Sequence, residues 1–332
     1  MRVRTMQRRR AAGGLAALLA GALSLAACGG GDEQTASPGG DPDEIEHPEL
    51  AVGVTPSLTF AQVFYADAEG IFDEHGLDVE LVPKGSSDVP PLLAGEYQIG
   101  TMAGATYIQA LAEGFPLRAL YPGVEGHTGA ISIMTMPGSG IEALDDLDGA
   151  AVAINQPGAA FEIFTRILLE DAGVGQDSVE FTTIPFSSMV EALVGGQVDA
   201  AVLTAPYNTI AEDQGAALAV DPFDGPLDGA PIAGFTVTEE FAGQNPNTVE
   251  AFVAAMDEAV ERLNALTDEE YAAFLPTFTS VEADVAARVV RPEYTTRVDV
   301  EQTQALADVM ADIGAIREEV DIEAAVVDVE SP

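Results

Sequence analysis

The sequence has few of the residues on which catalytic and metal sites depend. Its 332 residues include one cysteine, three histidines and no tryptophan, and its single lysine is Lys84. One cysteine excludes an internal disulfide, and no pair among His47, His75 and His127 has the spacing of two metal ligands. Hydrolases need a nucleophile with its base, and metalloenzymes need a cluster of ligands. We therefore expect no catalytic residue, no metal and no cofactor.

Positive charge is also scarce. The chain has 13 lysine and arginine residues against 55 acidic ones, a formal net charge of −42. Five of the arginines, Arg2, Arg4, Arg8, Arg9 and Arg10, lie in the first ten residues, so removal of that segment would lower the charge by five, to −47. A field of this sign repels nucleic acid and anionic lipid surfaces and favours solubility in salt. We expect no nucleic-acid partner.

The first 28 residues have the features of an export leader. The basic start is followed by an apolar stretch from Ala11 to Leu25 and then by Ala26-Ala27-Cys28. The stretch is shorter than the roughly 20 residues of a membrane-spanning helix. This arrangement resembles a bacterial lipoprotein signal, in which peptidase cuts before the cysteine and its thiol carries a diacylglyceryl group. The resemblance implies a signal peptide over 1–27, lipidation of Cys28 and an extracytoplasmic protein anchored to the cell membrane. The alternative is an ordinary secretory signal.

A flexible acidic tether, residues 28–49, is expected next. The 21 residues from Gly29 to Glu49 are rich in glycine, proline and acidic residues. A flexible coil of this length has a root-mean-square span of roughly 25 Å. The remaining residues, 50–332, exceed the size at which a single core usually stops growing, so two domains are expected.

From Leu50 the pattern alternates between short strands and helices, which is typical of α/β proteins with largely parallel sheets. Past Pro231 the pattern becomes helical, with a helix beginning at Asn245-Pro246 and another around Leu306 to Ile313. Strands are predicted at Leu50–Val54, Leu77–Pro83, Tyr97–Thr101, Leu117–Tyr121, Gly149–Asn155, Val179–Pro185 and Ala200–Thr204. The intervening helices are predicted near Thr59–Ile71, Ala105–Glu113, Ala159–Ala172 and Ser188–Gly195.

Several segments together resemble one family. They are AVGVTPSLTFAQVFYADAEGIFDEHGLDVELVPKGSSDVPPLLAGEYQIG, then Gly104 to Ile108, Leu144 to Gly149, and MVEALVGGQVDA from Met189 to Ala200. Each segment is weak alone, but their order and spacing resemble the solute-binding proteins of nitrate, taurine and aliphatic-sulfonate ABC importers. That family also includes thiamin-pyrimidine binders of the NMT1/THI5-like kind.

The resemblance implies a type II periplasmic-binding-protein fold, in which two α/β lobes joined by a two-strand hinge close on a small solute. Lobe one would comprise 50–127 and 237–332, and lobe two 128–236, with crossings near Gly126–Ser132 and Ala233–Thr238. The partners implied are a small molecule, the permease and ATPase subunits of an importer, and the membrane through the lipid anchor. The protein itself is expected to be a monomer.

The same resemblance assigns candidate ligand contacts to loops that follow strands. In lobe one they are Ser57, Thr59, Phe60, Gly85, Ser86, Ser87, Gly104, Ala105 and Thr106. In lobe two, Gln156, Gly158 and Ala159 follow a buried strand and open a helix, so the sequence itself makes their backbone amides candidates for the cleft, with Phe161, Phe186 and Tyr207 as an apolar wall. His127, near the hinge, is a further candidate, and a structural role is the alternative for it. Small hydroxyl residues at helix starts bind polar or anionic groups, although they also serve as helix caps. The aromatic residues would otherwise belong to the core.

The nature of the solute stays open at this stage. Lys84, Arg118 and Arg166 are the basic residues of the two α/β units, and we expect all three on the surface. An anion such as a sulfonate or nitrate would then be held by neutral dipoles. A pyrimidine-like heterocycle stacked on Tyr107, Phe161 or Phe186 is the competing ligand. Thr204-Ala205-Pro206 lacks the acidic residue that many relatives carry before the proline, which argues against taurine.

Two other classes of protein remain as alternatives. One is a sensing or scaffolding lipoprotein without a transport role. The other is an enzyme resembling the yeast-type pyrimidine synthases, but the cysteine-rich iron motif of those enzymes is absent here.

Overall fold

The computed structural model describes residues 44–84 and 89–328. Predictions for the leader, for Cys28, for nearly all of the tether and for Gly85, Ser86 and Ser87 concern residues outside this description. The described residues from Ile45 onward belong to one compact unit. No helix among them combines the length and apolar character needed to span a membrane.

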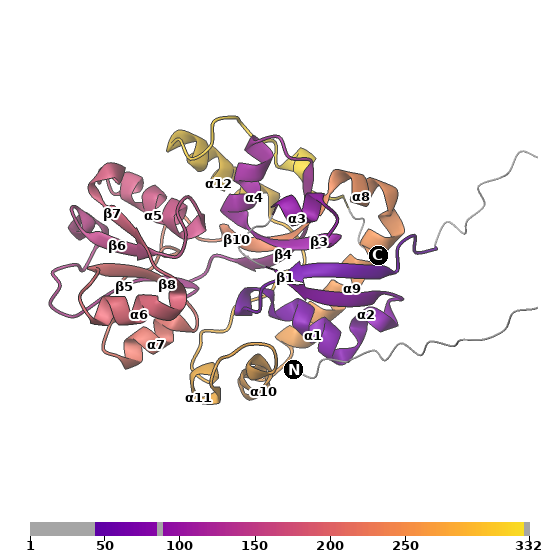
Figure 1. Cartoon of the computed structure of the whole chain (residues 1–332), viewed down its shortest axis with the longest axis horizontal. Coiled ribbons are helices and arrows are strands. Elements are labelled where there is room, and N and C mark those ends of the chain that lie inside the picture. The colour runs from indigo at the N-terminus through magenta and orange to yellow at the C-terminus, as the bar shows by residue number, and fades with distance from the viewer. Residues whose placement is uncertain (1–43, 85–88, 329–332) are drawn as a thin grey trace, which may run out of the picture. The chain divides into compact units, whose positions relative to one another are not determined.

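A five-stranded mixed sheet, sheet A, forms the first lobe (Figure 1). Its order is β2 (Asp78–Pro83), β1 (Glu49–Val54), β3 (Ile99–Ala103), β10 (Pro231–Thr238) and β4 (Leu117–Glu125). Strand β1 runs parallel to β2 and β3, whereas β10 runs antiparallel to β3 and β4. Val52 of β1 and Ile99 of β3 are register partners, and both are fully buried. Apolar residues on both faces are what a sheet covered by helices on both sides requires.

A second five-stranded sheet, sheet B, forms the second lobe. Its order is β7 (Glu180–Thr183), β6 (Ala151–Ile154), β8 (Ala200–Thr204), β5 (Ile131–Thr135) and β9 (Ala217–Val220). Strands β6, β7 and β8 are parallel, and β5 is antiparallel to β8 and β9. The α/β fold with two lobes predicted from the sequence is therefore confirmed.

Two segments connect the sheets. Residues 126–130 lead from β4 to β5, at the first predicted crossing, and residues 221–230 lead from β9 to β10. The second crossing was predicted too late, because Ala233–Thr238 belongs to β10. The same strand shows that the helical prediction past Pro231 is wrong for residues 231–238. Strand β10 pairs with β3 and β4 of sheet A, and its Phe235 and Val237 are fully buried. Residues 231–236, predicted in lobe two, therefore belong to sheet A of the first lobe. The remaining domain boundaries stay a prediction.

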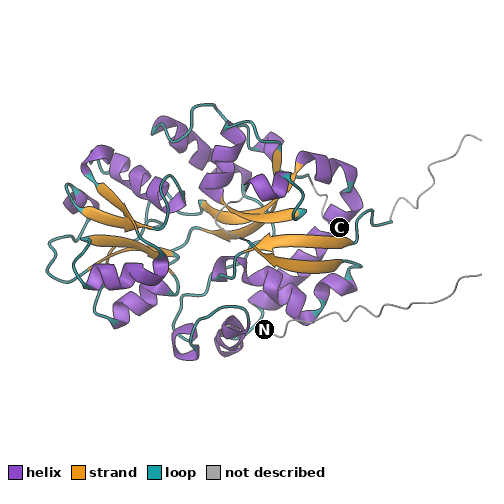
Figure 2. Ribbon diagram, viewed as in Figure 1, coloured by secondary structure: helices purple, strands orange, loops and turns teal. Residues whose placement is uncertain are grey.

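Helices pack on both sheets (Figure 2). Those of the first lobe are α1 (Ala61–Glu69), α2 (Ile71–Glu74), α3 (Val89–Leu93), α4 (Gly104–Ala112), α8 (Glu239–Gln244), α9 (Pro246–Asn264), α10 (Asp268–Phe274), α11 (Ala283–Ala286) and α12 (Val300–Asp312). Those of the second lobe are α5 (Ala160–Asp171), α6 (Phe186–Val194) and α7 (Tyr207–Asp213). Short 3₁₀ turns are η1 (Leu58–Phe60), η2 (Leu144–Leu147), η3 (Gln176–Ser178), η4 (Leu275–Thr277) and η5 (Glu323–Ala325).

Helix α9 shows how the sequence pattern produces the packing. Proline at its start supplies a preset φ angle and lacks an N–H that would have no helical partner. Phe252, Met256, Val260 and Leu263 recur at helical spacing and are all buried against α1, α2 and sheet A. Burial of each such side chain contributes about 1.5–3 kcal/mol. The predicted helix start at Asn245-Pro246 is confirmed.

One apolar cluster extends across both lobes. It joins Ile108 of α4 and Met310 of α12, which cover sheet A, to Phe164 and Leu168 of α5, which covers sheet B. The two lobes therefore share apolar contact beside the crossing segments, in addition to the two covalent connections.

Candidate functional site

A cavity of about 440 Å³ lies where the carboxyl ends of strands from the two sheets face one another. Sheet A contributes residues after β1 and β2 and residues of β3 and the start of α4, and sheet B contributes residues after β6 and the last residue of β8. Loops at the carboxyl ends of parallel strands form the ligand sites of open α/β sheets, and the volume suits a small organic molecule. The lining residues are Thr55, Ser57, Thr59, Phe60, Lys84, Thr101, Met102, Ala103, Thr106, Asn155, Gln156, Ala159, Ala160, Phe161, Phe186, Thr204, Ile232 and Ala233.

In the first lobe, the loop after β1 presents hydroxyl groups to the cavity. Ser57 has an extended backbone, with φ −151° and ψ 162°, and its side chain makes no capping hydrogen bond with the described start of η1. Leu58 and Phe60 are buried and hold this loop, and the ring of Phe60 meets that of Phe235 edge to face with centroids 5.6 Å apart. The Ser57 hydroxyl is therefore available to a bound molecule.

Two helices begin at the cavity, one in each lobe. Ala103 and Thr106 line it from the start of α4, and Ala159 and Ala160 line it from the start of α5. The first N–H groups of a helix have no partner within that helix, and they carry the positive end of its dipole. Two such ends on opposite walls favour negative charge in the space between them.

In the second lobe, aromatic side chains form one wall. Phe161 and Phe186 meet edge to face with centroids 5.4 Å apart. Tyr207 does not line the cavity, but it stacks on Phe186 with centroids 5.5 Å apart and an interplanar angle of 15°. This support orients Phe186, so that its ring offers a flat apolar surface to a bound molecule. Tyr207, predicted as part of the wall, instead lies behind it.

Lys84 is the one charged residue among those described around the cavity. It follows β2, is half-buried, and lines the cavity. No described carboxylate lines the cavity, although the chain has 55 acidic residues. The other two basic residues considered above lie elsewhere. Arg118 bonds to the Ala324 carbonyl and to Glu239, and Arg166 pairs with Glu162 at 2.6 Å.

Two polar residues after β6 complete the cavity wall. Gln156 was predicted there, whereas Asn155 was missed, because nothing in the sequence separates it from the preceding strand. The Oδ1 atom of Asn155 is buried and has no hydrogen-bond partner among the described residues. Such an atom is costly unless a ligand or water supplies a partner.

Gly104, Ala105, Gly158 and His127 are not among the lining residues. Gly104 packs against β10, since a Cβ there would lie 2.2 Å from the carbonyl oxygen of Pro231, and Ala105 is fully buried. The Gly158 N–H donates to Glu162 at 2.8 Å, and the Gly158 carbonyl accepts from Gln109 of α4 at 3.1 Å. His127 lies in the first crossing segment, with Nδ1 3.0 Å from the Glu125 carbonyl oxygen.

Tyr107 cannot provide the stacking surface suggested for a heterocycle. It is buried, and its hydroxyl accepts from the Ala119 N–H at 2.9 Å and donates to the Ala325 carbonyl. Burial raises the pKa of this phenol far above its usual value. The hydroxyl therefore serves to attach the C-terminal segment to β4.

No group of three or more histidine, cysteine or acidic residues within 44–84 and 89–328 is placed to hold a metal ion. The chemistry that the described cavity offers is recognition. It combines hydroxyls, amides, helix N-termini, one ammonium group and aromatic rings.

Two solved structures with the same fold are named as binding proteins. The aliphatic sulphonate binding protein SsuA of Escherichia coli matches with a TM-score of 0.72 and 22% identity, over 84% of this chain and 97% of that one. The nitrate-binding protein NrtA of Synechocystis PCC 6803 matches with a TM-score of 0.69 and 16% identity, over 84% of this chain and 85% of that one. These matches show that the fold is that of periplasmic binding proteins.

The relatives found by sequence align with only part of the chain. A protein of Brucella abortus, named for a binding role, is 27% identical over 199 residues, which are 58% of this chain and 60% of the relative. A protein of Haemophilus influenzae, named for thiamine biosynthesis, is 24% identical over 225 residues, 65% of this chain and 68% of the relative. The chain thus spans about 60% of the length of the Brucella relative. The model of the family described as NMT1/THI5 like matches residues 57–269, more than half of the sequence, so the chain belongs to the NMT1/THI5-like family.

Proposed function

We propose that the protein is an extracytoplasmic solute-binding lipoprotein of an ABC importer. It captures a small organic solute between its lobes and delivers it to a permease. The observation that carries this proposal is the cavity between the strand ends of two facing sheets, lined by polar groups and free of described carboxylates. Binding proteins named for sulfonate and nitrate share its fold, which supports solute capture. The leader and Cys28 support export and a lipid anchor.

We propose further that the solute is an organic anion with an apolar or aromatic body. Lys84 and the N-termini of α4 and α5 favour the anionic group, while Phe60, Phe161 and Phe186 favour the body. In a chain with a net charge of −42, a described lining without a carboxylate avoids repulsion of the ligand. Sulfonates with a bulky body fit this description, and one relative of this fold is an alkanesulfonate-binding protein bound to MOPS.

A neutral pyrimidine-like heterocycle is the second candidate. The stacked pair of Phe186 and Tyr207 and the edge-on ring of Phe161 favour it, as does the relative named for thiamine biosynthesis. We propose no catalytic role, because the described lining contains no histidine, cysteine or carboxylate, and no metal-binding cluster lies among the described residues.

The test is a binding panel on the purified mature chain, measured by thermal shift and calorimetry. The panel contains alkanesulfonates, aryl sulfonates, nitrate and aminopyrimidines. A bound solute raises the melting temperature in a concentration-dependent way. If the solute is anionic, Lys84→Gln weakens its binding about tenfold or more, whereas Arg118→Gln, which removes a basic residue outside the cavity, does not. A Lys84→Gln variant with unchanged affinity would instead indicate the heterocycle, and a panel without any binder would count against solute capture.

A further inference from the structure

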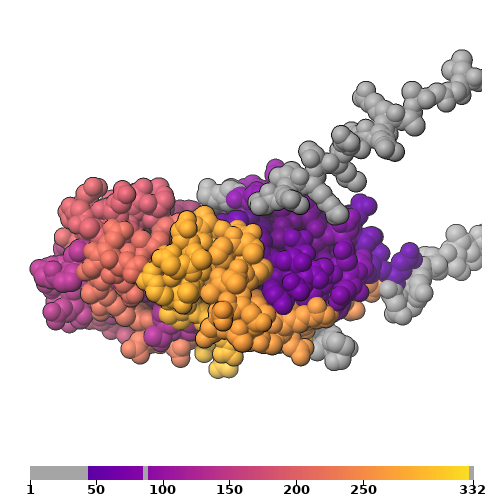
Figure 3. Space-filling view, turned by 90° about the horizontal axis from the view of Figure 1, so that it is seen from below, coloured from indigo at the N-terminus to yellow at the C-terminus, as the bar shows by residue number. Residues whose placement is uncertain are grey.

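The segment between α11 and α12 touches both lobes and the first crossing. We call residues 288–295 the return segment. It belongs to the first lobe by its attachment, yet one of its side chains reaches α7 of the second lobe. In Figure 3, which views the molecule from below, the gold and orange surface of the region around α10 and α11 adjoins the salmon surface of the second lobe.

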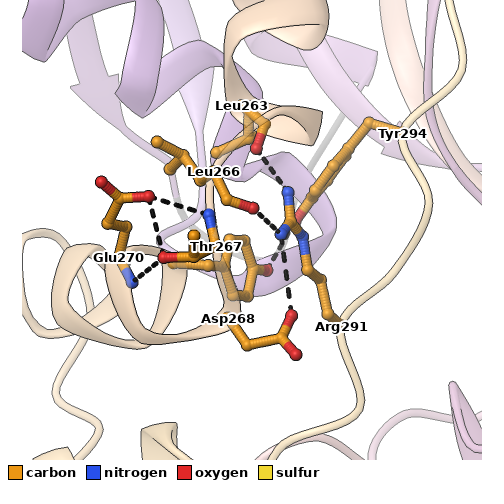
Figure 4. Close-up of polar contacts among 8 residues, drawn as sticks. Leu263, Leu266, Thr267, Asp268, Glu270, Arg291 and Tyr294 are labelled. Carbon is orange, nitrogen blue, oxygen red and sulfur yellow. Dashed lines mark hydrogen bonds and ion pairs between the residues drawn. The ribbon is translucent and has the colours of Figure 1, made fainter.

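Two residues fix the return segment to the first lobe (Figure 4). Arg291 donates to the Leu263 carbonyl in the last turn of α9 and, at 2.7 Å, to the Leu266 carbonyl just beyond that helix. Its guanidinium also lies 4.7 Å from the centroid of the Tyr271 ring. Tyr294 is 2% exposed and donates to the Leu58 carbonyl at 2.7 Å. The Arg291 cation at the C-terminus of α9 and the buried hydrogen bond from the Tyr294 hydroxyl both attach the return segment to the first lobe.

From this base Arg288 reaches the second lobe. Its Nη1 lies 2.6 Å from Oδ1 of Asp213, and its Nη2 lies 2.8 Å from Oδ2 of the same residue, the last one of α7. Each nitrogen bonds to a different carboxylate oxygen, the two-pronged arrangement that gives an arginine–carboxylate pair its geometric specificity. The Arg166–Glu162 and Arg118–Glu239 pairs, by contrast, each join residues of a single lobe.

The surroundings of the pair also support an interlobe role. Val290 lies against Gly129 of the first crossing segment, where a Cβ would approach a Val290 methyl carbon to 3.2 Å. Glu125, the last residue of β4, accepts from Thr295 at 3.3 Å. Asp284, 4.0 Å from Arg288, lies on the same lobe as Arg288 and so adds nothing across the cleft. The return segment thus lies beside the hinge with its one exposed cation directed at the opposite lobe.

We propose that Arg288 and Asp213 form a latch that holds the two lobes together and thereby slows release of whatever occupies the cavity. The latch is a property of the lobes alone, and its effect on solute release rests on the proposed function. Breaking the pair shifts the population toward separated lobes by about two- to fivefold, the range of an exposed ion pair.

The experiment measures the distance between the lobes without any solute. Spin labels are placed on cysteines introduced at Glu191 of α6 and Glu240 of α8, two exposed positions, in the full chain with Cys28 replaced by serine. Arg288→Gln and Asp213→Asn should each move the distance distribution to longer values. Added salt should do the same to the unaltered pair and much less to either variant. Exchange of the two charges, Arg288→Asp with Asp213→Arg, should restore the shorter distances.

The matched control is Arg262→Gln, which removes an exposed arginine paired with Glu258 and Glu74 inside the first lobe and should leave the distances unchanged. Unchanged distances in both latch variants, or an effect of Arg262→Gln as large as theirs, would overturn the proposal, as would a failure of the charge exchange to restore them. Because no ligand is used, a negative binding panel leaves this result intact.

Discussion

The hydroxyl of Tyr294 donates a 2.7 Å hydrogen bond to the carbonyl of Leu58, 236 residues earlier in the chain. Leu58 lies between Ser57 and Thr59, which both line the cavity. The Tyr271 hydroxyl is 2.8 Å from that of Tyr294. Each phenol has one proton, and Tyr294 uses its own on Leu58, so Tyr271 is the donor to Tyr294. These two consecutive hydrogen bonds position the segment Ser57–Thr59 at the cavity.

The first prediction concerns these two hydrogen bonds. Tyr294→Phe removes both bonds and leaves the Leu58 carbonyl with only the Ala61 N–H as donor, whereas Tyr271→Phe removes one bond. We expect Tyr294→Phe to lower the free energy of unfolding by about 1–3 kcal/mol and Tyr271→Phe by about 1 kcal/mol. Denaturant melts measure both. Equal losses in the two variants would contradict the assigned direction. Burial raises the pKa of Tyr271 to about 12, so its hydrogen bond to Tyr294 should persist through pH 9.

The second prediction concerns pH and Glu125. Burial raises the pKa of this carboxyl above 4.5, opposed by the Thr295 hydrogen bond and assisted by Asp299 and Glu293. A raised folded-state pKa means that the folded protein keeps this proton up to a higher pH than the unfolded chain does. The free energy of unfolding therefore falls as the pH rises from the unfolded-state pKa through the folded-state pKa. Glu125→Gln should therefore melt higher than the unaltered protein at pH 7, with a smaller difference at pH 4. Glu191→Gln, an exposed carboxylate on α6, is the control. A Glu125→Gln gain that is the same at both pH values would count against this cause.

The third prediction concerns the packing of α4 on β10. In Gly104→Ala, the new Cβ would lie 2.2 Å from the Pro231 carbonyl oxygen, which cannot move without disturbing sheet A. We expect a loss of about 2–3 kcal/mol in denaturant melts. Gly243→Ala in α8 is the matched control, because no atom lies within 4 Å of its Cβ, and it should be neutral or slightly stabilising. A Gly104→Ala variant as stable as the control would show that α4 can shift freely.

The fourth prediction separates the aromatic wall from the core. Phe186 lines the cavity and stacks on Tyr207, while Phe64 is equally half-buried and stacks on Phe278 outside the cavity. Phe186→Ala should weaken binding of the solute found by the panel about tenfold or more, because the solute loses the aromatic ring on which its apolar body packs. Phe64→Ala should reduce stability to a similar extent with little change in affinity. Calorimetry and melts on both variants give the two quantities. Equal affinities would remove Phe186 from the site.

The sequence predicted the parallel parts of the fold well. Strands β1, β6 and β8 are short, mainly apolar runs, and β2 alternates acidic and apolar residues; both patterns are recognisable without tertiary information. Strand β10 was missed, because its glycine and threonine interrupt the apolar run and its partners, β3 and β4, lie more than 100 residues earlier. Long-range pairing, and not local propensity, determines that strand.

The candidate site was predicted in outline and corrected in detail. Ser57, Thr106, Gln156 and Phe161 were chosen from their loops and do meet at one cavity. Lys84 was expected on the surface with Arg118 and Arg166, and only the meeting of two sheets places it, half-buried, at the cavity. Tyr107 was chosen for its ring, but its place in α4 points the hydroxyl toward β4. Loop membership is visible in a sequence, whereas side-chain direction depends on packing.

The position of Lys84 also gives a way to read occupancy directly. It is the single lysine of the whole sequence, so it supplies the one side-chain amine that an acylating reagent can find. Because Lys84 lines the cavity, a molecule seated there should shield it from modification. Mass spectrometry of one peptide would then report how full the site is, with no dye, tag or labelled compound.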